Sequence, residues 1–185
     1  ETHFNGPAAV LVAPNGEIWI ADGHRGGNNR VTKFSAEGDL LLQLGGGIDS
    51  LSRETSYFND PHDLKMDSQG RVFVADRGNN RIQIFSQAGE LLDIWTQFGR
   101  PSGIWIDSND TIYVADGMSG AQWNTGWQRG IRIGSAASGW ITEFIPDYEV
   151  PTGSGIEFLA SDSEGNIYAG QVGRQRFEKY VRVRP

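Results

Sequence analysis

Three histidines and no cysteine limit the metal and acid–base chemistry open to this 185-residue chain. The histidines are His3, His24 and His62. Without cysteine there is no disulfide, no thiolate metal site and no cysteine nucleophile, so His, Asp or Glu must hold any transition metal. A histidine before a strand, as we expect for His62, is more often a hydrogen-bonded turn residue than a metal ligand. We expect His3 to be an ordinary terminal residue.

Three aspartates, Asp22, Asp76 and Asp116, recur at equivalent places and invite a catalytic interpretation. A residue that returns in every repeat is more often a turn cap, because its carboxylate accepts backbone N–H bonds. We therefore expect these aspartates to be structural, together with the Asn-Asn-Arg segments at 28–30 and 79–81. No nucleophile-elbow signature supports Ser-His-Asp catalysis.

The elements that position these residues are short β-strands arranged in repeats. A turn residue followed by an apolar-alternating strand occurs at 16–22, 70–76, 110–116 and 165–170. The alanines of these strands, Ala21, Ala75, Ala115 and Ala169, lie 54, 40 and 54 residues apart. A period near 40 residues with strand patterns alone is typical of a β-propeller blade.

Each repeat has the same internal order of strands. First strands are expected at 9–12, 63–66, 103–106 and 156–159, and third strands at 30–34, 81–85, 130–133 and 177–181. Outer fourth strands are expected at 39–43, 90–95 and 140–144, and the last repeat reaches Pro185 without one. Period-2 alternation and Val, Ile and aromatic enrichment favour strand over helix throughout. The sequence predicts an all-β, single propeller domain over residues 1–185, with repeats at about 4–46, 58–99, 100–148 and 151–185.

Two insertions explain the longer spacings, one at 45–56 and one at 118–129. The second contains Trp123 and Trp127 among small polar residues. One interpretation is an ordered surface loop that the two rings hold in place, and the other is a wall of a binding site.

Composition excludes some partners and leaves the compartment open. The net charge of −7 and pI of 4.9 argue against binding to nucleic acid or to an anionic membrane, which need a basic face. The first residues do not resemble a signal peptide, and no apolar run reaches the roughly 20 residues of a membrane span. We expect a soluble protein, either cytoplasmic or periplasmic or secreted.

The segment VADRGNNRIQIF at 74–85 resembles the NHL repeat, the unit of a large group of six-bladed β-propellers. Within that group, four segments are similar to the peptidyl-α-hydroxyglycine α-amidating lyases and their bacterial relatives: Phe4-Asn-Gly-Pro, Ala-Asp-Gly-His24, Asn-Asp-Pro-His62-Asp and Phe98-Gly-Arg100-Pro. The resemblance implies cleavage of a carbinolamide into an amidated peptide and glyoxylate. It also implies a zinc ion held by three histidines at the mouth of the propeller channel.

The resemblance assigns metal ligands only in part. His62 matches a zinc-ligand histidine of the family, and the same offset in the fourth repeat places Glu157 where the family has its last ligand. The equivalent positions in the first and third repeats are Ala8 and Ser102, and the family's first histidine falls before residue 1. First strands of successive blades begin at one end of the channel, so His62 and Glu157 are expected to share an ion. A catalytic zinc usually takes three protein ligands, and this pair is one short.

The resemblance also assigns substrate contacts. Arg100 falls where the family binds substrate through an arginine, so it is expected to bind the substrate carboxylate. His24 replaces the family's catalytic tyrosine and is expected to act as acid or base. The family's structural calcium uses an acidic residue after the last ligand, where this chain has Phe158, so calcium stays open.

Together these features predict a lyase-like propeller acting on a small peptide-like substrate through a channel-mouth metal. The alternative is a non-catalytic propeller that presents loops, above all 118–129, to a protein or ligand. Four repeats do not readily close a six-bladed ring, so the chain is expected to be the C-terminal part of a larger propeller or an incomplete one. Open blade edges would then favour a homodimer.

Overall fold

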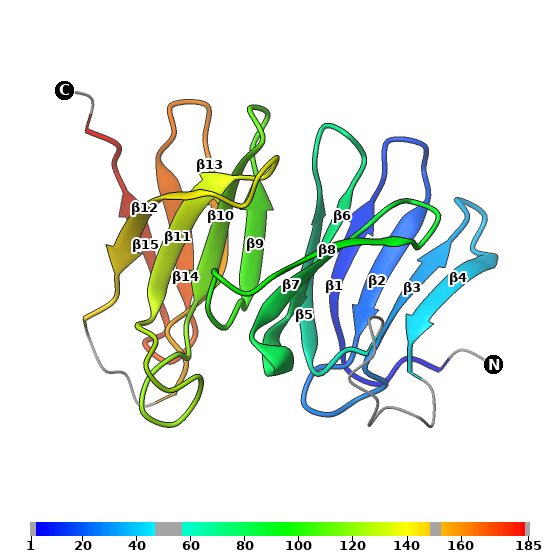
Figure 1. The fold of residues 1–185 in the computed structure, drawn as a ribbon, viewed down its shortest axis with the longest axis horizontal. Helices are drawn as coiled ribbons and strands as arrows, with labels where there is room; N and C mark the ends of the chain where they lie inside the picture. Colours follow the sequence, from blue (N-terminus) through cyan, green and yellow to red (C-terminus); the bar gives the residue numbers. More distant parts are fainter. Residues whose placement is uncertain (1–2, 47–56, 149–152, 184–185) are drawn as a thin grey trace. The chain divides into compact units, whose positions relative to one another are not determined.

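The computed structural model describes residues 3–46, 57–148 and 153–183, which form four antiparallel β-sheets (Figure 1). The predicted all-β propeller class is therefore confirmed. The chain divides into two compact units, Glu1–Trp95 and Thr96–Pro185. Most of the predicted 45–56 insertion, residues 47–56, and residues 151–152 and 184–185 of the last predicted repeat lie outside the described residues.

The first unit contains two four-stranded sheets in which each strand pairs with its neighbour in the chain. The first sheet consists of β1 (Pro7–Val12), β2 (Ile18–Asp22), β3 (Arg30–Phe34) and β4 (Leu40–Gly45). The second consists of β5 (Pro61–Met66), β6 (Val72–Asp76), β7 (Arg81–Phe85) and β8 (Leu91–Trp95). Among the described residues, the one helical element is the single 3₁₀ turn η1 (Arg77–Asn79).

The second unit contains one four-stranded and one three-stranded sheet. The four strands are β9 (Gly103–Ile106), β10 (Thr111–Asp116), β11 (Gly130–Ser135) and β12 (Ile141–Pro146). The last sheet consists of β13 (Ile156–Ser161), β14 (Ile167–Gln171) and β15 (Arg176–Tyr180), and the residues described after β15 add no fourth strand. Dimerisation through exposed blade edges stays a prediction.

Three of the four first strands carry a β-bulge at their start. The pairing steps from Pro61↔Asp76 to Asp63↔Ala75, which leaves His62 as the extra residue. The same step leaves Ala8 extra in β1 and Glu157 extra in β13. In the third sheet Ser102 lies just before β9 and donates its backbone N–H to the carbonyl of Ala115 (2.8 Å). His62 therefore lies inside its strand, whereas the sequence predicted it before the strand, because β5 begins two residues earlier than expected.

Apolar side chains fill the space between consecutive sheets within each unit. In the first unit the buried cluster includes Trp19, Phe58, Leu64 and Phe85. In the second unit Tyr113, Ile131, Ile156 and Ile167 form the corresponding cluster. Fully burying a Leu, Ile or Phe side chain contributes about 1.5–3 kcal/mol, so these clusters hold the sheets together face to face.

The turn that precedes each second strand needs a left-handed residue. Gly16, Gly70 and Gly165 adopt φ of +86°, +76° and +82° there, which glycine tolerates because it has no Cβ. Asp110 takes the same place in the third sheet with φ of +55°, a region that Asp enters more readily than most residues. The predicted turn before each second strand is therefore present even where the glycine is replaced by Asp110.

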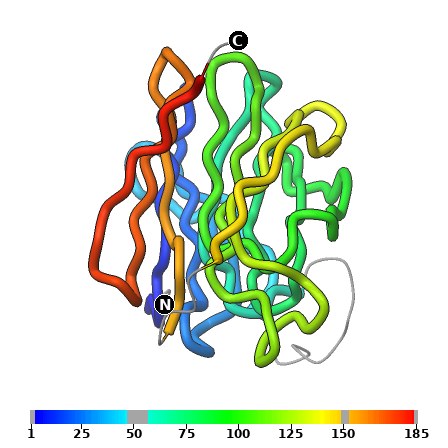
Figure 2. Tube along the Cα trace, turned by 90° about the vertical axis from the view of Figure 1, so that its left-hand side faces the viewer, coloured from blue at the N-terminus to red at the C-terminus, as the bar shows by residue number. Residues whose placement is uncertain are grey.

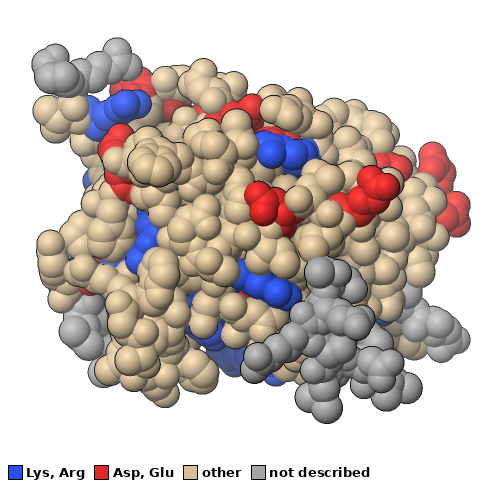
Figure 3. Space-filling model, in the orientation of Figure 1, with Lys and Arg blue, Asp and Glu red and all other residues tan. Residues whose placement is uncertain are grey.

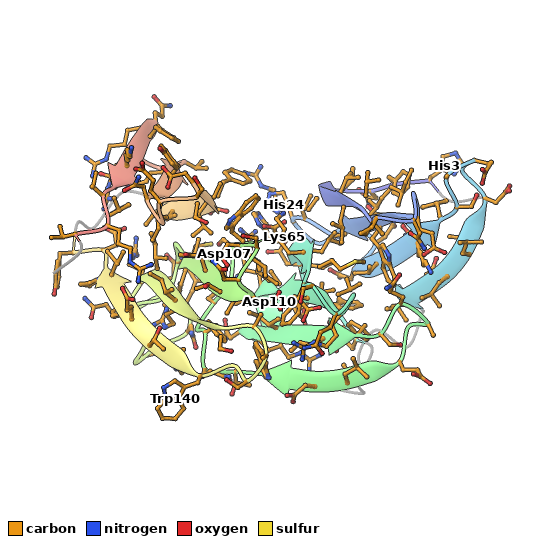
Figure 4. The ribbon with its side chains drawn as sticks, turned by 90° about the horizontal axis from the view of Figure 1, so that it is seen from above. His3, His24, Lys65, Asp107, Asp110 and Trp140 are labelled. Carbon is orange, nitrogen blue, oxygen red and sulfur yellow. The ribbon has the colours of Figure 1, made fainter. Side chains whose placement is uncertain are left out.

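The surface carries mixed charge. On the face drawn in Figure 3, Lys and Arg side chains form separate patches among uncharged residues and Asp and Glu. Trp140, 74% exposed, points away from the sheets in Figure 4. Within the described ranges, no helix has the length and apolar character needed to cross a membrane.

Candidate functional site

The bulge at the start of β5 places His62, which is only 7% exposed. β-bulges interrupt the alternation of side chains and re-aim one of them, and they are frequent next to functional sites. The backbone of β5 therefore turns His62 out of the normal alternation of the strand.

His24 lies directly against His62. The two ring centroids are 4.9 Å apart and the rings meet edge to face at 68°. His24 follows β2, and the preceding Gly23 makes this approach possible, because a Cβ there would lie 2.5 Å from Cδ of Pro61. Figure 4 shows His3 on the outer side of the first sheet, well apart from His24. The structure thus brings together two of the predicted site residues and leaves His3 aside.

Asp60 connects the loop of His24 to the second sheet. Its backbone N–H donates to Oδ1 of Asn29 (2.9 Å), and its own Oδ1 accepts the N–H of Arg25 (3.2 Å). Oδ1 also lies 3.3 Å from Nδ1 of His24. Oδ2 accepts Nε and Nη2 of Arg77 at 2.9 and 2.7 Å. Asp60 does this with a left-handed φ of +57°, a region that Asp enters more readily than most residues.

The electrostatics keep Asp60 charged. Burial alone would raise the pKa of this carboxyl, but the charge and hydrogen bonds of Arg77 and the N–H of Arg25 outweigh burial. The pKa of Asp60 is therefore held below its usual range. Nδ1 of His24 also lies 3.1 Å from Nη2 of Arg77, so this nitrogen is engaged by either neighbour. Only when Nδ1 donates to Asp60 does Nε2 of the neutral ring present a lone pair that can accept a proton.

In the second unit, Arg100 lies beneath an aromatic ring. Its guanidinium carbon is 5.0 Å from the ring centroid of Trp123, and its backbone N–H donates to Oδ2 of Asp116 (3.1 Å). Arg100 is 7% exposed, whereas Trp123 is 44% exposed. The structure thus brings together two further predicted site residues, Arg100 and Trp123.

The 118–129 connection is an ordered loop held by a chain of hydrogen bonds. Asp116 accepts the backbone N–H of Ser119 (2.9 Å), and the hydroxyl of Ser119 accepts Nδ2 of Asn124 (2.9 Å). The carbonyl of Asn124 then accepts the N–H of Trp127 (3.2 Å). In Figure 2 this yellow-green loop extends past the ends of β10 and β11. The prediction of a surface loop carrying two tryptophan rings is confirmed, and its binding role stays a prediction.

Glu157 occupies the bulge of β13 and is 5% exposed. The neighbouring sheet comes close to it, since a Cβ on Gly103 would lie 2.5 Å from the carbonyl oxygen of Glu157. His62 and Glu157 therefore share a backbone position but lie in different units. Their joint binding of an ion stays a prediction.

A catalytic zinc site needs about three His, Cys, Asp or Glu ligands around one point. Across residues 3–46, 57–148 and 153–183 no such group of three is present. The described residues thus do not fit the zinc site that the family resemblance implies. The place of the family's calcium ligand is taken by Phe158, whose apolar side chain is mostly exposed and cannot bind a cation.

The recurring aspartates are turn caps, as predicted. Asp22 accepts the N–H of Asn5 (2.9 Å), and Asp76 accepts the N–H of Asn59 (2.8 Å). All three aspartates are fully buried. The Asn-Asn-Arg segments serve the same carboxylates: Asn28 and Arg30 bind Asp22, and Asn79 and Arg81 bind Asp76.

Sequence reasoning missed Asp60 and Arg77 as members of the site. Each is next to a feature that was recognised, since Asp60 lies two residues before His62 and Arg77 follows the capping Asp76. Only the approach of one sheet to the next brings them to His24, and no spacing in the sequence encodes that approach.

Comparison with known proteins points to one kind of repeat. The NHL repeat family matches residues 4–34 and 58–85. Human NHL repeat-containing protein 3 is 31% identical over 184 residues, covering 96% of this chain and 50% of the human protein. Peptidyl-glycine alpha-amidating monooxygenase B of Xenopus laevis is 30% identical over 186 residues, covering 92% of this chain and 20% of the frog protein. A probable peptidyl-alpha-hydroxyglycine alpha-amidating lyase of Caenorhabditis elegans is 40% identical over 87 residues, or 46% of this chain and 24% of the worm protein.

Solved structures share the fold. A streptogramin B lyase structure aligns with a TM-score of 0.61 at 16% identity, covering 95% of this chain and 54% of that chain. The structure of U3-55K aligns with a TM-score of 0.64 at 13% identity, covering 98% of this chain and 53% of that chain. Identities this low show the fold alone. The chain spans half or less of the length of the relatives it matches.

Proposed function

We propose, on the premise that this chain is an NHL-repeat β-propeller protein related to the amidating lyases, that it supplies acid–base residues for cleavage of a peptidyl-α-hydroxyglycine or a related carbinolamide. The observation that carries the proposal is the edge-to-face pair of His24 and His62 at the bulge of β5. A lyase of this kind needs a group that can both take and return a proton, and imidazole does so near neutral pH.

The reaction breaks the bond between the carbinolamide carbon and the amide nitrogen. The hydroxyl loses its proton, the carbonyl of glyoxylate forms, and the amide nitrogen gains a proton. With its Nδ1–H donated to Asp60, His24 takes the hydroxyl proton at Nε2, and the resulting imidazolium returns a proton to the nitrogen. Asp60 stabilises the imidazolium through its negative charge, while Arg77 keeps that carboxylate ionised.

Arg100 supports recognition of the substrate carboxylate. A guanidinium pairs with a carboxylate through two parallel hydrogen bonds, which fixes orientation as well as charge. The shielding of Arg100 from water strengthens such a pair, because charges interact more strongly where water is excluded.

Metal dependence is a separate part of the proposal. A zinc ion at the site would polarise the substrate oxygen as a Lewis acid. His62 and Glu157 each stay a proposed ligand, one in each unit. The two do not complete a catalytic zinc site, so no step above depends on the metal.

The test is turnover of a synthetic α-hydroxyglycine peptide by purified protein, followed as glyoxylate release. His24→Ala should lower the rate by about 10²- to 10⁴-fold, the usual range for loss of acid–base catalysis. His62→Ala should lower the rate less, because it removes only the ring that packs against His24. His3→Ala is the matched control, because His3 is exposed and lies apart from His24. Circular dichroism should show all three variants folded. Unchanged rates in folded His24→Ala would exclude this residue as the acid–base group, and metal analysis of the same samples tests zinc independently.

The second candidate is a non-catalytic propeller that binds through its 118–129 loop. The partial exposure of Trp123 and Trp127 on a hydrogen-bonded loop favours it. Loops on rigid scaffolds commonly carry binding function. Absence of turnover in the wild-type protein, together with retained peptide binding, would place this candidate first.

A further inference from the structure

The second unit contains a cavity between its two sheets that no step of the proposed reaction uses. Its volume is about 800 Å³, within the range typical of small-molecule sites. Strands β10, β11 and β12 form one wall, and β14, β15 and the residues after β15 form the other (Figure 1). Every residue that lines the cavity belongs to Thr96–Pro185, so it lies within one compact unit.

The cavity and the bulge of Glu157 lie at opposite ends of the sheets. β10 begins at Thr111, which lines the cavity, and ends at Asp116. The next residue, Gly117, lies against Ile156 at the start of β13, where a Cβ would come within 2.5 Å of the carbonyl oxygen. At about 3.4 Å per residue, the two ends of β10 are roughly 17 Å apart. The cavity is therefore separate from the bulge of Glu157.

Apolar side chains form the inner part of the cavity. Tyr113, Ile133 and Ile167 line it and belong to the buried cluster between the two sheets. Tyr113 is directly opposite Ile133, and Ile133 is opposite Glu143, so these three side chains share one face of the four-stranded sheet. In the three-stranded sheet Ile167 pairs with Tyr180. A ligand with apolar or aromatic side chains can therefore pack against rings and branched chains on both walls.

Hydrogen bonds hold both tyrosine rings in place. The hydroxyl of Tyr113 donates to Oδ2 of Asp107 (3.1 Å), and the hydroxyl of Tyr180 donates to Oε2 of Glu178 (2.7 Å). A ring that is positioned before binding loses little conformational freedom when a ligand packs against it, which favours affinity.

Two side chains of opposite charge line the cavity, one on each wall. Glu143 belongs to β12, and Arg182 follows β15. The backbone N–H of Arg182 donates to Oδ1 of Asn166 (3.1 Å), and its guanidinium lies against Gly165, where a Cβ would be 3.2 Å from Nη1. Among the described residues, no side chain forms a hydrogen bond or ion pair with the Glu143 carboxylate or the Arg182 guanidinium. Both charges are therefore available to a ligand.

We infer that this cavity binds a short peptide with free termini and apolar side chains. The ammonium group of the peptide pairs with Glu143, its carboxylate pairs with Arg182, and its side chains pack between Tyr113 and Tyr180. A simple anion would meet the like charge of Glu143, and a simple cation would meet that of Arg182. A ligand whose two charges are separated by a peptide backbone satisfies both walls. The inference goes beyond the proposed function and does not depend on it.

The test is calorimetric titration of the purified protein with the dipeptide valyl-phenylalanine and three related peptides. The N-acetylated dipeptide lacks the ammonium charge, and the C-terminal amide lacks the carboxylate. Glycyl-glycine keeps both charges but has no apolar side chain. Each of the three should bind the wild-type protein about tenfold more weakly than valyl-phenylalanine, because each lacks one of the contacts.

Matched variants assign each charge to its partner. Glu143→Gln should weaken binding of valyl-phenylalanine about tenfold and remove the effect of acetylation, while amidation still weakens binding. Arg182→Gln should remove the effect of amidation and keep that of acetylation. Lys179→Gln is the control and should bind as the wild type does. Lys179 is equally exposed but lies over the Tyr168 ring, on the other face of the sheet from Tyr180. Circular dichroism should show all three variants folded.

Three results would overturn the inference. The first is the absence of measurable binding of valyl-phenylalanine to the wild-type protein. The second is an acetylation effect that survives in Glu143→Gln, or an amidation effect that survives in Arg182→Gln. The third is a loss in Lys179→Gln as large as that in Arg182→Gln, which would show that general surface charge attracts the peptide.

Discussion

The two units build the same backbone junction and equip it with different side chains. In the first unit, Gly23 after Asp22 lies against Pro61 at the start of β5. In the second unit, Gly117 after Asp116 lies against Ile156 at the start of β13. A Cβ on either glycine would come within 2.5 Å of its neighbour, so both junctions depend on glycine for close approach.

The side chains around this shared junction differ at three places. The first unit has His24, Asp60 and His62 where the second has Met118, Gly155 and Glu157. Only the first unit therefore assembles imidazole, carboxylate and guanidinium groups at the bulge. The comparison teaches that the repeat provides the location and that a few substitutions provide the chemistry.

The largest difference between the two bulges is expected in stability. Leu64, two residues after His62, is fully buried, whereas Phe158, next to Glu157, is 58% exposed. Leu64→Ala should lower the free energy of unfolding by about 2–5 kcal/mol, because it leaves a cavity between the sheets. Phe158→Ala should change it by less than about 1 kcal/mol. Urea denaturation of both variants checks this, and equal losses would show that the two junctions are equally covered.

The ion pair at the first junction should make stability depend on pH. Asp60→Asn keeps the shape and tolerates the left-handed backbone, yet removes the charge that binds Arg77. We expect Asp60→Asn to lower the free energy of unfolding by about 1.5–3 kcal/mol at pH 7, the usual contribution of hydrogen bonds to charged groups.

The folded-state pKa of Asp60 is lowered from 3.8, so its contribution is complete above that value and is lost as the pH falls below it. The difference in the free energy of unfolding between wild type and Asp60→Asn, measured by urea denaturation, should therefore be full at pH 7 and smaller below pH 3.8. A difference that stays constant as the pH falls below 3.8 would contradict a role for the Asp60 charge.

Gly23 and Gly117 both allow the next sheet to approach closely, so their substitutions should be equally destabilising. Gly23→Ala and Gly117→Ala should each lower the free energy of unfolding by about 1–3 kcal/mol, because the added Cβ overlaps the next sheet. Gly170→Ala is the control, since its Cβ would meet Phe158 only at ordinary contact distance, 3.7 Å. Thermal unfolding of the three variants measures the effect. A loss at only one of Gly23 and Gly117 would show that the junctions are not equivalent.

The smallest effect is expected at the turn that follows β13. Asp162 accepts the backbone N–H groups of Glu164 and Asn166 and the hydroxyl of Tyr168. The side-chain hydrogen bond from Asn166 is the leading cause that lowers the pKa of Asp162 to about 2. Asp162→Asn should lower the Tm slightly at pH 7. The difference should shrink as the pH falls from 3.8 towards 2, and a calorimetric pH series would detect its absence.

Much of the fold followed from the sequence because its cause is local. Alternating apolar residues and left-handed turn residues placed all four sheets, and repetition identified Asp22, Asp76 and Asp116 as caps. Strand starts were less accurate at the bulges of Ala8 and His62, where β1 and β5 each begin two residues earlier than predicted, whereas β13 begins at Ile156 as predicted. A bulge breaks the very alternation on which strand prediction rests.

The site followed only in part because its geometry is not local. His24 and His62 were predicted separately, and their contact depends on the packing of the first sheet against the second. Asp60 carries no signature beyond its place before a proline, and Arg77 looks like a turn residue. Their roles depend on contacts across 17 residues or more, which a repeat pattern cannot encode.

The 118–129 loop begins and ends next to a closed strand pair, since Asp116 is directly opposite Gly130. The hairpin is therefore complete before the insertion starts, and its register does not depend on the length of the segment between. Evolution can replace this segment without disturbing the sheet, as antibody frameworks exchange their variable loops. For protein engineers, the same closure makes this the position of choice for grafting a new recognition loop.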